Sequence, residues 1–304
     1  MTNAEVVAEL ERERDRRVLS IQSHLHGFEV DAINSVQFSN HAGNIEYLTL
    51  PTRYETVKGQ KLTEKELEDL YEGLTANKIN NYTHVLTGYC GNVTFLQKIA
   101  DVVKDLKQKD PETKFVCDPV MGDNGRYYTP KELMPVYRDL IIPLADVLTP
   151  NAFELGELTG SPIETEEDCL KAVSDLHAKG VKTIVVTSGV TGAQTQQSLR
   201  CYASVQGSEC YRFTFPRLMG QFVGTDVFAS LLVVWLDELN GDISEAVKKV
   251  LSSLQCLIRK TSDYAQLQVD TNSRAMCELR LIQSRKELLW PPSCDKIHVE
   301  KVGK

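Results

Sequence analysis

The feature that most constrains this chain is a repeated alternation of short β-branched or aromatic runs with longer amphipathic stretches. Residues 183–186 read Thr-Ile-Val-Val, the kind of run that a strand buried on both faces requires. Residues 63–77 and 95–106 instead repeat apolar side chains at helical spacing. Strands that alternate with helices predict an α/β chain, in which a mainly parallel central sheet carries helices on both faces.

The same patterns give the approximate element boundaries. Strands are predicted at 18–21, 30–33, 84–87, 115–117, 145–148 and 183–186, with an antiparallel pair at 199–205 and 211–215. Helices are predicted at 63–77, 95–106, 165–179, 226–239, 244–260 and 271–289. The first of these helices has a capping box and one apolar face, formed by Thr63 with Glu66 and by Leu67, Leu70, Tyr71 and Leu74.

No repeat, low-complexity run or linker divides the chain. We therefore interpret residues 1–304 as one domain, in which the mostly charged residues 1–16 form a helical extension without chemistry. The composition, 42% hydrophobic and 25% charged, is that of a globular protein. The net charge of -8 argues against a general surface for nucleic acid or anionic membranes, although it allows a local phosphate site.

Cysteine usage and the N-terminus bear on the compartment. The eight cysteines are scattered singly, without a Cys-x-x-Cys pair, which favours free thiols in a reducing environment. The N-terminal residues contain no apolar signal core. The longest mainly apolar run, 228–236, is shorter than the about 20 residues that a membrane span needs. A cytoplasmic protein is the expectation.

Ligands of open α/β sheets bind beyond the carboxyl ends of the strands, so the residues that follow each strand are the candidates for a site. Asp118 and Asp123 follow the strand at 115–117 and flank a glycine. Their carboxylates suit Mg²⁺, which prefers oxygen ligands and bridges phosphates. Surface turns rich in Asp and Gly are also common, so the pattern alone leaves both interpretations open.

Two further strand ends carry polar residues. Asn151 and Glu154 follow the strand at 145–148, where they either serve a site or only cap the next helix. Thr187 and Ser188 follow the strand at 183–186, where hydroxyl groups either contact a phosphate or close a bend. Neither pair decides between these alternatives.

The segment Gly224-Thr225-Asp226 leads directly into an apolar helix. Backbone N–H groups at a helix N-terminus form an anion site, and an aspartate there can take a proton from a hydroxyl nucleophile. The alternative is a plain N-cap at Thr225 with a favourable first-turn acid at Asp226.

Six segments, in this order, resemble the pyridoxal kinases of the ribokinase-like superfamily: 17–24, 34–41, 86–89, 117–123, 148–151 and 222–225. The resemblance runs from Arg17 nearly to the C-terminus. It implies a ribokinase-like three-layer α/β/α fold and a cytosolic, usually dimeric enzyme. Such an enzyme uses ATP and Mg²⁺ to phosphorylate the 5′-hydroxymethyl group of pyridoxal, pyridoxine or pyridoxamine. The resemblance leaves open a monovalent cation such as K⁺.

The resemblance also implies roles by position. Ser23 would hydrogen-bond the pyridine ring, and Asp226 would bind the substrate hydroxyl and act as the catalytic base. ATP contacts would come from Asp118, Tyr128, Asn151, Phe153, Glu154, Thr187, Ser188, Phe222, Val223, Gly224 and Thr225. The metal would be held, directly or through waters, by Asp123, Thr149 and Glu154.

The chain departs from the family near its N-terminus. Only Leu25 and His26 stand between His24 and Gly27, where the family carries a longer segment that includes its first helix. Parallel strands are usually joined by a crossover of about a dozen or more residues. We therefore expect one of the strands at 18–21 and 30–33 to shift, pair differently or leave the sheet, and we expect the lost helix to expose apolar sheet surface.

A second departure lies in the anion site. The family reads Gly-Thr-Gly-Asp, whereas Asp226 here follows Thr225 directly. The missing glycine removes one backbone N–H donor, and a shift of one residue turns the base by about 100° around the helix axis. Loss of one such donor costs about 10²–10³ in rate, so greatly reduced activity is expected.

Four alternatives follow from the sequence. The chain is an active pyridoxal kinase, a catalytically impaired relative that binds ligand or pairs with an intact subunit, a hydroxymethylpyrimidine kinase, or the product of a transcript variant or gene-model error. Residues 20–24 and 35–38 are more similar to the pyridoxal branch than to the pyrimidine branch. Ala42 replaces a threonine that often contacts pyridoxal, and residues 44–60 form either a flap at the substrate side or a dimer contact.

Overall fold

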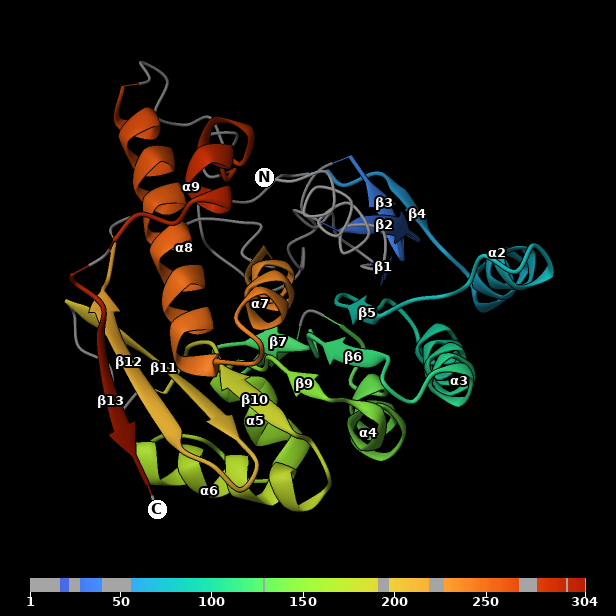
Figure 1. Cartoon of the computed structure of the whole chain (residues 1–304), viewed down its shortest axis with the longest axis horizontal. Coiled ribbons are helices and arrows are strands. Elements are labelled where there is room, and N and C mark those ends of the chain that lie inside the picture. The colour runs from blue at the N-terminus through green and yellow to red at the C-terminus, as the bar shows by residue number, and fades with distance from the viewer. Residues whose placement is uncertain are drawn as a thin grey trace, which may run out of the picture.

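A central nine-stranded sheet organises the computed structural model, which describes residues 17–21, 28–39, 56–127, 129–190, 197–218, 227–267, 278–293 and 295–303. Figure 1 shows the sheet running across the molecule, with helices on both sides. In spatial order its strands are β13 (His298–Val302), β12 (Cys210–Pro216), β11 (Ser198–Val205), β10 (Thr183–Val186), β9 (Val147–Leu148), β6 (Lys114–Cys117), β5 (His84–Thr87), β1 (Arg17–Ile21) and β2 (Glu29–Ala32).

Strand direction divides the sheet into two parts. From β2 to β10 every neighbouring pair is parallel, whereas β10, β11, β12 and β13 pair antiparallel. The predicted parallel sheet and the predicted antiparallel pair are both confirmed. Two small pairs lie outside this sheet: β3 (Val36–Phe38) with β4 (Gly59–Lys61), and β7 (Gly122–Asp123) with β8 (Arg126–Tyr127).

Each face of the sheet has its own core. One core packs the sheet against α2 (Glu64–Ala76), α3 (Val93–Lys109), α4 (Leu133–Val136), α5 (Ala152–Thr159) and α6 (Glu166–Ala178). The other packs it against α7 (Val227–Glu238), α8 (Ile243–Gln266) and the short α9 (Arg285–Leu289). The expected three-layer α/β/α arrangement is therefore confirmed, and Figure 1 shows α7 and α8 on the side opposite α3 to α6.

Local sequence signals explain where several helices begin. Thr63 and Glu66 form the predicted capping box of α2, since the Thr63 hydroxyl accepts from the Glu66 N–H and Glu66 accepts from the Thr63 N–H. Asn151 with Glu154 and Thr165 with Asp168 do the same for α5 and α6. The prediction that Leu70 belongs to the buried face of α2 is wrong. Leu67 is buried, but the Leu70 side chain is 48% exposed. The reason is that α2 lies at the periphery and packs mainly on α3.

The expected disruption of the first two strands is wrong. β1 and β2 pair in parallel, with Arg17 opposite Glu29, and Val18 and Leu19 are buried on opposite faces of the sheet. The five residues of β1 rise only about 16 Å. Residues 22–28 can extend over about 23 Å, so the chain can return to the start of β2 without a crossover helix.

Two predicted boundaries also need correction. The helix expected at 271–289 is only the 3₁₀ turn Ile282–Ser284 followed by α9; residues 271–277 lie outside the described part of the chain. The Arg280 N–H donates to the Thr261 hydroxyl on α8 rather than to a carbonyl of its own segment. The strand expected at 145–148 is shortened to β9, because the 3₁₀ turn Ile142–Leu144 ends directly before it, at Ala145.

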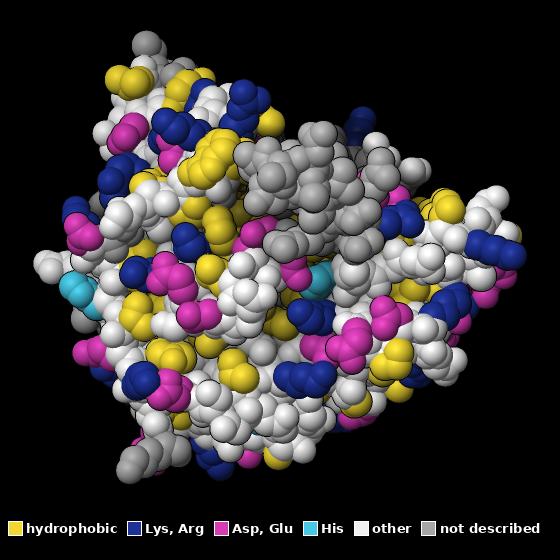
Figure 2. All heavy atoms as spheres, viewed as in Figure 1, with side chains coloured by type: hydrophobic (Ala, Val, Ile, Leu, Met, Phe, Trp, Pro, Cys, Tyr) yellow, Lys and Arg dark blue, Asp and Glu magenta, His cyan; other side chains and the backbone are white. Residues whose placement is uncertain are grey.

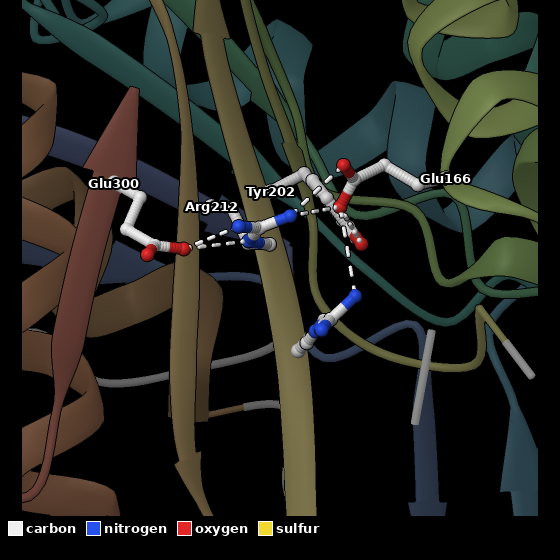
Figure 3. A network of polar contacts seen from close by, with 5 residues as sticks. Glu166, Tyr202, Arg212 and Glu300 are labelled. Atoms are coloured by element: carbon white, nitrogen blue, oxygen red, sulfur yellow. Dashed lines mark hydrogen bonds and ion pairs between the residues drawn. The ribbon is translucent and has the colours of Figure 1, made fainter. Parts of the chain in front are cut away.

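A polar cluster fixes α6 to the antiparallel edge of the sheet (Figure 3). The Arg212 guanidinium on β12 donates to both oxygens of Glu166 at 2.9 Å and also pairs with Glu300 on β13. The Tyr202 hydroxyl on β11 donates to Glu166 at 2.8 Å. One carboxylate at the start of α6 is thus bound from two neighbouring strands.

The surface carries no dominant field of one sign on the face seen in Figure 2, where acidic and basic side chains of the described residues are interspersed. Within the described ranges, none of the helices combines the length and the apolar character needed to cross a membrane. Among the described residues, Cys90, Cys117, Cys169, Cys201 and Cys210 are free thiols.

Candidate active site

The carboxyl ends of four adjacent parallel strands, β5, β6, β9 and β10, meet at one edge of the sheet. Backbone hydrogen bonds continue beyond the ends of the strands and hold the following loops side by side. Three bonds of this kind are Asp118 N–H to Thr87 O at 2.9 Å, Thr149 N–H to Cys117 O at 3.1 Å and Thr187 N–H to Pro150 O at 3.0 Å. Three of the predicted site segments are therefore adjacent in space.

Asp118 and Thr149 are in direct contact. The Thr149 hydroxyl donates to Asp118 Oδ1 at 3.2 Å, although the two residues are 31 positions apart. Thr149 is buried and Asp118 is half-buried. The pair therefore forms an oxygen-rich floor at the carboxyl edge of β6 and β9.

Glu154 is a buried carboxylate held by backbone donors. Its Oε1 accepts from the N–H groups of Met121 at 2.9 Å and Gly122 at 3.4 Å, and its Oε2 accepts from the Asn151 N–H at 2.9 Å. Burial, and after it the negative charge of Asp118, raises the pKa of Glu154 to about 8. We call Asp118 and Glu154 the acidic pair.

The acidic pair supplies carboxylate oxygens, the kind of ligand that Mg²⁺ prefers. In the described part of the chain, none of the hydrogen-bond partners of Glu154 is cationic. A divalent cation would therefore favour the ionised form that burial and Asp118 oppose. No group of three His, Cys, Asp or Glu side chains among the described residues could enclose a metal alone. This fits Mg²⁺, which usually binds one or two carboxylates, waters and phosphates rather than an all-protein cage.

Asn151 joins the loop of the acidic pair to α5. Its side chain caps the helix through the Glu154 N–H at 3.0 Å and donates to the Gly122 carbonyl at 2.7 Å. A Cβ at Gly122 would lie 2.0 Å from the Arg126 carbonyl oxygen and 2.7 Å from the Phe153 ring, so this position requires glycine. The predicted cap at Asn151 is confirmed, and the same side chain also bonds to the loop that carries Gly122.

The remaining described candidates surround this centre. The Asp123 carboxylate accepts from the backbone and side chain of Asn124 at 2.8 and 2.9 Å, and burial raises its pKa. Phe153 packs edge-on against Tyr127, with ring centroids 5.2 Å apart. The Ser188 carbonyl accepts from the Ala152 N–H at 2.9 Å, which places the end of β10 against the N-terminus of α5.

Comparisons with known proteins agree with this geometry. Residues 21–269 match the pfkB family carbohydrate kinase model. A Caenorhabditis elegans protein with the name "Putative pyridoxal kinase" is 83% identical over 320 aligned positions, which cover 100% of each chain. The pyridoxal kinase of Arabidopsis thaliana is 40% identical over 301 positions, or 90% of this chain and 92% of that one. The chain belongs to the pyridoxal kinase family.

A solved structure extends the likeness to the fold. The pyridoxal kinase from Leishmania donovani in complex with ADP and pyridoxamine has a TM-score of 0.81 and 33% sequence identity, covering 95% of this chain and 100% of that one. The alignment with the C. elegans protein is longer than the 304 residues of this chain, so part of that relative has no counterpart here. The short segment after His24 predicts the same thing, namely that this chain lacks residues that its relatives have.

Seven predicted site residues of this family member lie outside the described residues: Ser23, Tyr128, Phe222, Val223, Gly224, Thr225 and Asp226. Their neighbours can still be located. The described part of α7, Val227–Glu238, lies within the predicted helix 226–239 and packs against β6, the strand that directly precedes Asp118. The roles of these seven residues stay predictions.

The sequence reasoning missed two residues beside the site. The Ser35 hydroxyl, buried just before β3, donates to the Tyr89 carbonyl at 2.7 Å and so ties the β3–β4 pair to the loop after β5. Burial raises the pKa of Tyr89. Sequence position could have pointed to Tyr89, because it follows β5 in the same way that Asp118 follows the neighbouring parallel strand β6.

Proposed function

We propose that this chain phosphorylates the 5′-hydroxymethyl group of pyridoxal, pyridoxine and pyridoxamine with ATP. The observation that carries the proposal is the acidic pair beside Thr149, an oxygen-rich site at the carboxyl edge of a parallel sheet, in a chain that belongs to the pyridoxal kinase family. The family likeness to a kinase solved with ADP and pyridoxamine supports the choice of both substrates.

The described residues would hold the magnesium nucleotide. Mg²⁺ bound with ATP would supply positive charge to a phosphoryl group in transfer. Asp118 would lie by the phosphates, Thr149 and Asp123 would serve the metal directly or through waters, and Glu154 would complete its shell. The backbone donors to Glu154 would fix the direction of that carboxylate before the nucleotide binds.

Other predicted residues would complete the nucleotide site. Asn151, Phe153, Thr187 and Ser188 would contact ATP from the N-terminus of α5 and the end of β10. The sequence adds Tyr128, Phe222 and Val223 to these contacts.

Proton transfer is assigned to Asp226 from the sequence. Asp226 would take the proton of the 5′-hydroxyl group as that oxygen attacks, and Ser23 would hold the pyridine ring. N–H groups near Gly224 and Thr225 would stabilise the transferring oxygens. Since the family glycine before Asp226 is missing, turnover would be well below that of an intact family member.

The assembly and setting are part of the same proposal. We infer a single-domain, homodimeric and cytoplasmic enzyme with a requirement for Mg²⁺ and a monovalent cation such as K⁺. The free thiols support a reducing compartment. Family resemblance supports the dimer and the cations.

The test is ATP-dependent formation of pyridoxal 5′-phosphate by the purified chain with Mg²⁺. Asp226→Asn is the blank, and a variant with glycine inserted between Thr225 and Asp226 is the gain-of-function arm. The insertion is expected to raise kcat by about 10²–10³. Weak wild-type turnover that disappears in Asp226→Asn supports the proposal.

Two other outcomes would redirect it. Stabilisation by ADP and pyridoxal without turnover in the wild type would identify an impaired, ligand-binding relative. Faster phosphorylation of hydroxymethylpyrimidine than of pyridoxal would contradict the proposed substrate and favour the pyrimidine branch.

A further inference from the structure

The small β7–β8 pair joins the acidic pair to a tyrosine that the predicted site does not include. Its two strands are connected by Asn124 and Gly125, whose φ angles of 50° and 76° both lie in the left-handed region. Two such residues form a tight hairpin turn, which fixes the register of the strands that it joins. In this register Tyr127 on β8 is the partner of Gly122 on β7.

Gly122 connects the hairpin directly to the acidic pair. Its N–H group donates to Glu154 Oε1 at 3.4 Å, and its carbonyl oxygen accepts from the Asn151 side chain at 2.7 Å. The N–H group of Met121, the residue before β7, donates to the same oxygen of Glu154 at 2.9 Å. The placement of β7 therefore determines two of the three described backbone donors that orient Glu154.

Tyr127 fixes the other strand of the hairpin to α5. Its hydroxyl group donates to the carboxylate of Glu157, which lies three residues after Glu154 on the same helix. Its ring packs edge-on against Phe153, and the Lys131 ammonium group lies 5.3 Å from the ring centroid. Burial and the bond to Glu157 raise the pKa of Tyr127, so the phenol stays a neutral donor at neutral pH.

The two attachments hold one face of the hairpin against α5. Cross-strand partners carry their side chains on the same face, so Tyr127 lies on the face where Gly122 has no side chain. A Cβ at Gly122 would lie 2.7 Å from the Phe153 ring, which leaves Tyr127 to supply the side-chain contact there. A continuous path thus runs from Glu157 through Tyr127 and Gly122 to Glu154.

We infer that the Tyr127–Glu157 hydrogen bond is a positioning contact for nucleotide binding: it holds the β7–β8 hairpin against α5 and thereby orients Glu154 toward the Mg²⁺ of the bound nucleotide. The inference rests on the proposed function, since it takes the acidic pair as the magnesium site. The same bond fixes the strand that directly precedes Tyr128, a residue predicted to contact ATP.

Tyr127→Phe tests the inference, with Tyr71→Phe as the matched control. Each substitution removes a half-buried hydroxyl group that donates to a carboxylate, to Glu157 in the first case and to Asp105, at 2.5 Å, in the second. The Kd of Mg²⁺·ADP should rise about three- to tenfold in Tyr127→Phe, which corresponds to one hydrogen bond. It should stay at the wild-type value in Tyr71→Phe, because that bond joins α2 to α3. Isothermal titration calorimetry measures the Kd without turnover.

Variants at Glu157 separate positioning from a general packing defect. Glu157→Gln keeps an acceptor oxygen for the Tyr127 hydroxyl, so it should keep the wild-type Kd. Glu157→Met has a similar length but no oxygen acceptor, so it should raise the Kd as much as Tyr127→Phe does. Combining Tyr127→Phe with Glu157→Met should cause no further increase, because both substitutions remove the same bond.

The Kd values decide the outcome. An unchanged Kd in Tyr127→Phe and Glu157→Met, beside a wild type that binds Mg²⁺·ADP, would overturn the positioning role and leave the proposed function intact. Equal increases in Tyr127→Phe and Tyr71→Phe would also overturn it, since a general loss of stability would then explain both. A wild type that neither binds Mg²⁺·ADP nor forms pyridoxal 5′-phosphate would refute the proposed function, and this inference with it.

Discussion

Two glutamates, each in the first turn of a helix, are treated very differently by this fold. Glu154 is the third residue of α5 and accepts from backbone donors, beside the negative charge of Asp118. Glu166 opens α6 and is held by Arg212 and Tyr202, with Arg200 3.7 Å away (Figure 3). Burial disfavours both charges, but at Glu166 the bonds from Arg212 and Tyr202 outweigh it and lower the pKa, whereas the pKa of Glu154 is raised.

The difference lies in whether the protein supplies a counter-charge to each carboxylate. Glu166 finds its counter-charge inside the protein, so its ion pairs link a helix to the edge of the sheet. Glu154 is oriented but not neutralised by its described partners, which leaves its charge available to a cation brought by a ligand. Glu154 at the third position of its helix and Glu166 at the first thus differ in whether the described residues supply a cationic partner.

The largest effect is expected from Glu154→Gln. Glutamine keeps the size of the side chain and removes the charge, so kcat/KM for Mg²⁺·ATP should fall about 10- to 100-fold. The free energy of unfolding of the ligand-free chain should fall by about 1–3 kcal/mol, because the amide NH2 group of glutamine cannot accept from the backbone N–H groups that one carboxylate oxygen binds. Kinetics at several Mg²⁺ concentrations and urea unfolding check the two parts. A loss of stability with normal kinetics would mean that Glu154 is structural.

Glu166→Gln should lower stability without changing the kinetics. Its loss leaves Arg212 with Glu300 alone, so unfolding should become easier by about 1–3 kcal/mol, the usual cost of breaking a charged hydrogen bond. The KM values should stay at those of the wild type, because the bonds of Glu166 go to β11 and β12 rather than to the residues that follow β6 and β9. Urea denaturation with steady-state kinetics measures both quantities. An increase in KM for Mg²⁺·ATP would mean that Glu166, like Glu154, contributes to nucleotide binding.

The pH dependence of stability should isolate the Glu166 cluster. The pKa of Glu166 is lower in the folded chain than its ordinary value, so its contribution is present above about pH 4.3 and is lost as the pH falls through the folded value. The stability difference between wild type and Glu166→Gln should therefore shrink between about pH 6 and about pH 3.5. Urea titrations at both pH values measure it. A difference that stays constant would mean that the charge of Glu166 contributes nothing.

Sequence patterns predicted the elements that carry these glutamates but not their partners. Alternating strand and helix periods and the capping residues at Asn151 and Thr165 are local signals, so the parallel sheet and the helix starts could be predicted. The donors to Glu154 come from 32 and 33 positions earlier, and Arg212 is 46 positions from Glu166. Such pairings depend on which strands become neighbours, and a single sequence does not contain that information.

The failed predictions have the same origin. Leu70 fits the helical period of α2, but its exposure depends on what covers α2. The parallel pairing of β1 with β2 contradicts a rule that assumes a long crossover, because β1 is so short that seven residues have the length to reach back along it. Local periodicity predicts which residues form an element, while packing decides what that element touches.

The smallest effect is expected from Arg200→Met, which tests which arginine holds Glu166. Arg200 approaches Glu166 only at 3.7 Å, and its Nε is buried without a hydrogen-bond partner in the described residues, whereas Arg212 makes two bonds at 2.9 Å. Methionine keeps most of the aliphatic stem, so unfolding should change by at most about 1 kcal/mol, within the range of a weak ion pair. Arg212→Met, measured beside it by urea unfolding, should cost clearly more because it leaves Glu166 without its two short bonds. Equal losses would mean that the charge of the cluster, rather than the geometry of the Arg212 bonds, holds α6 to the sheet.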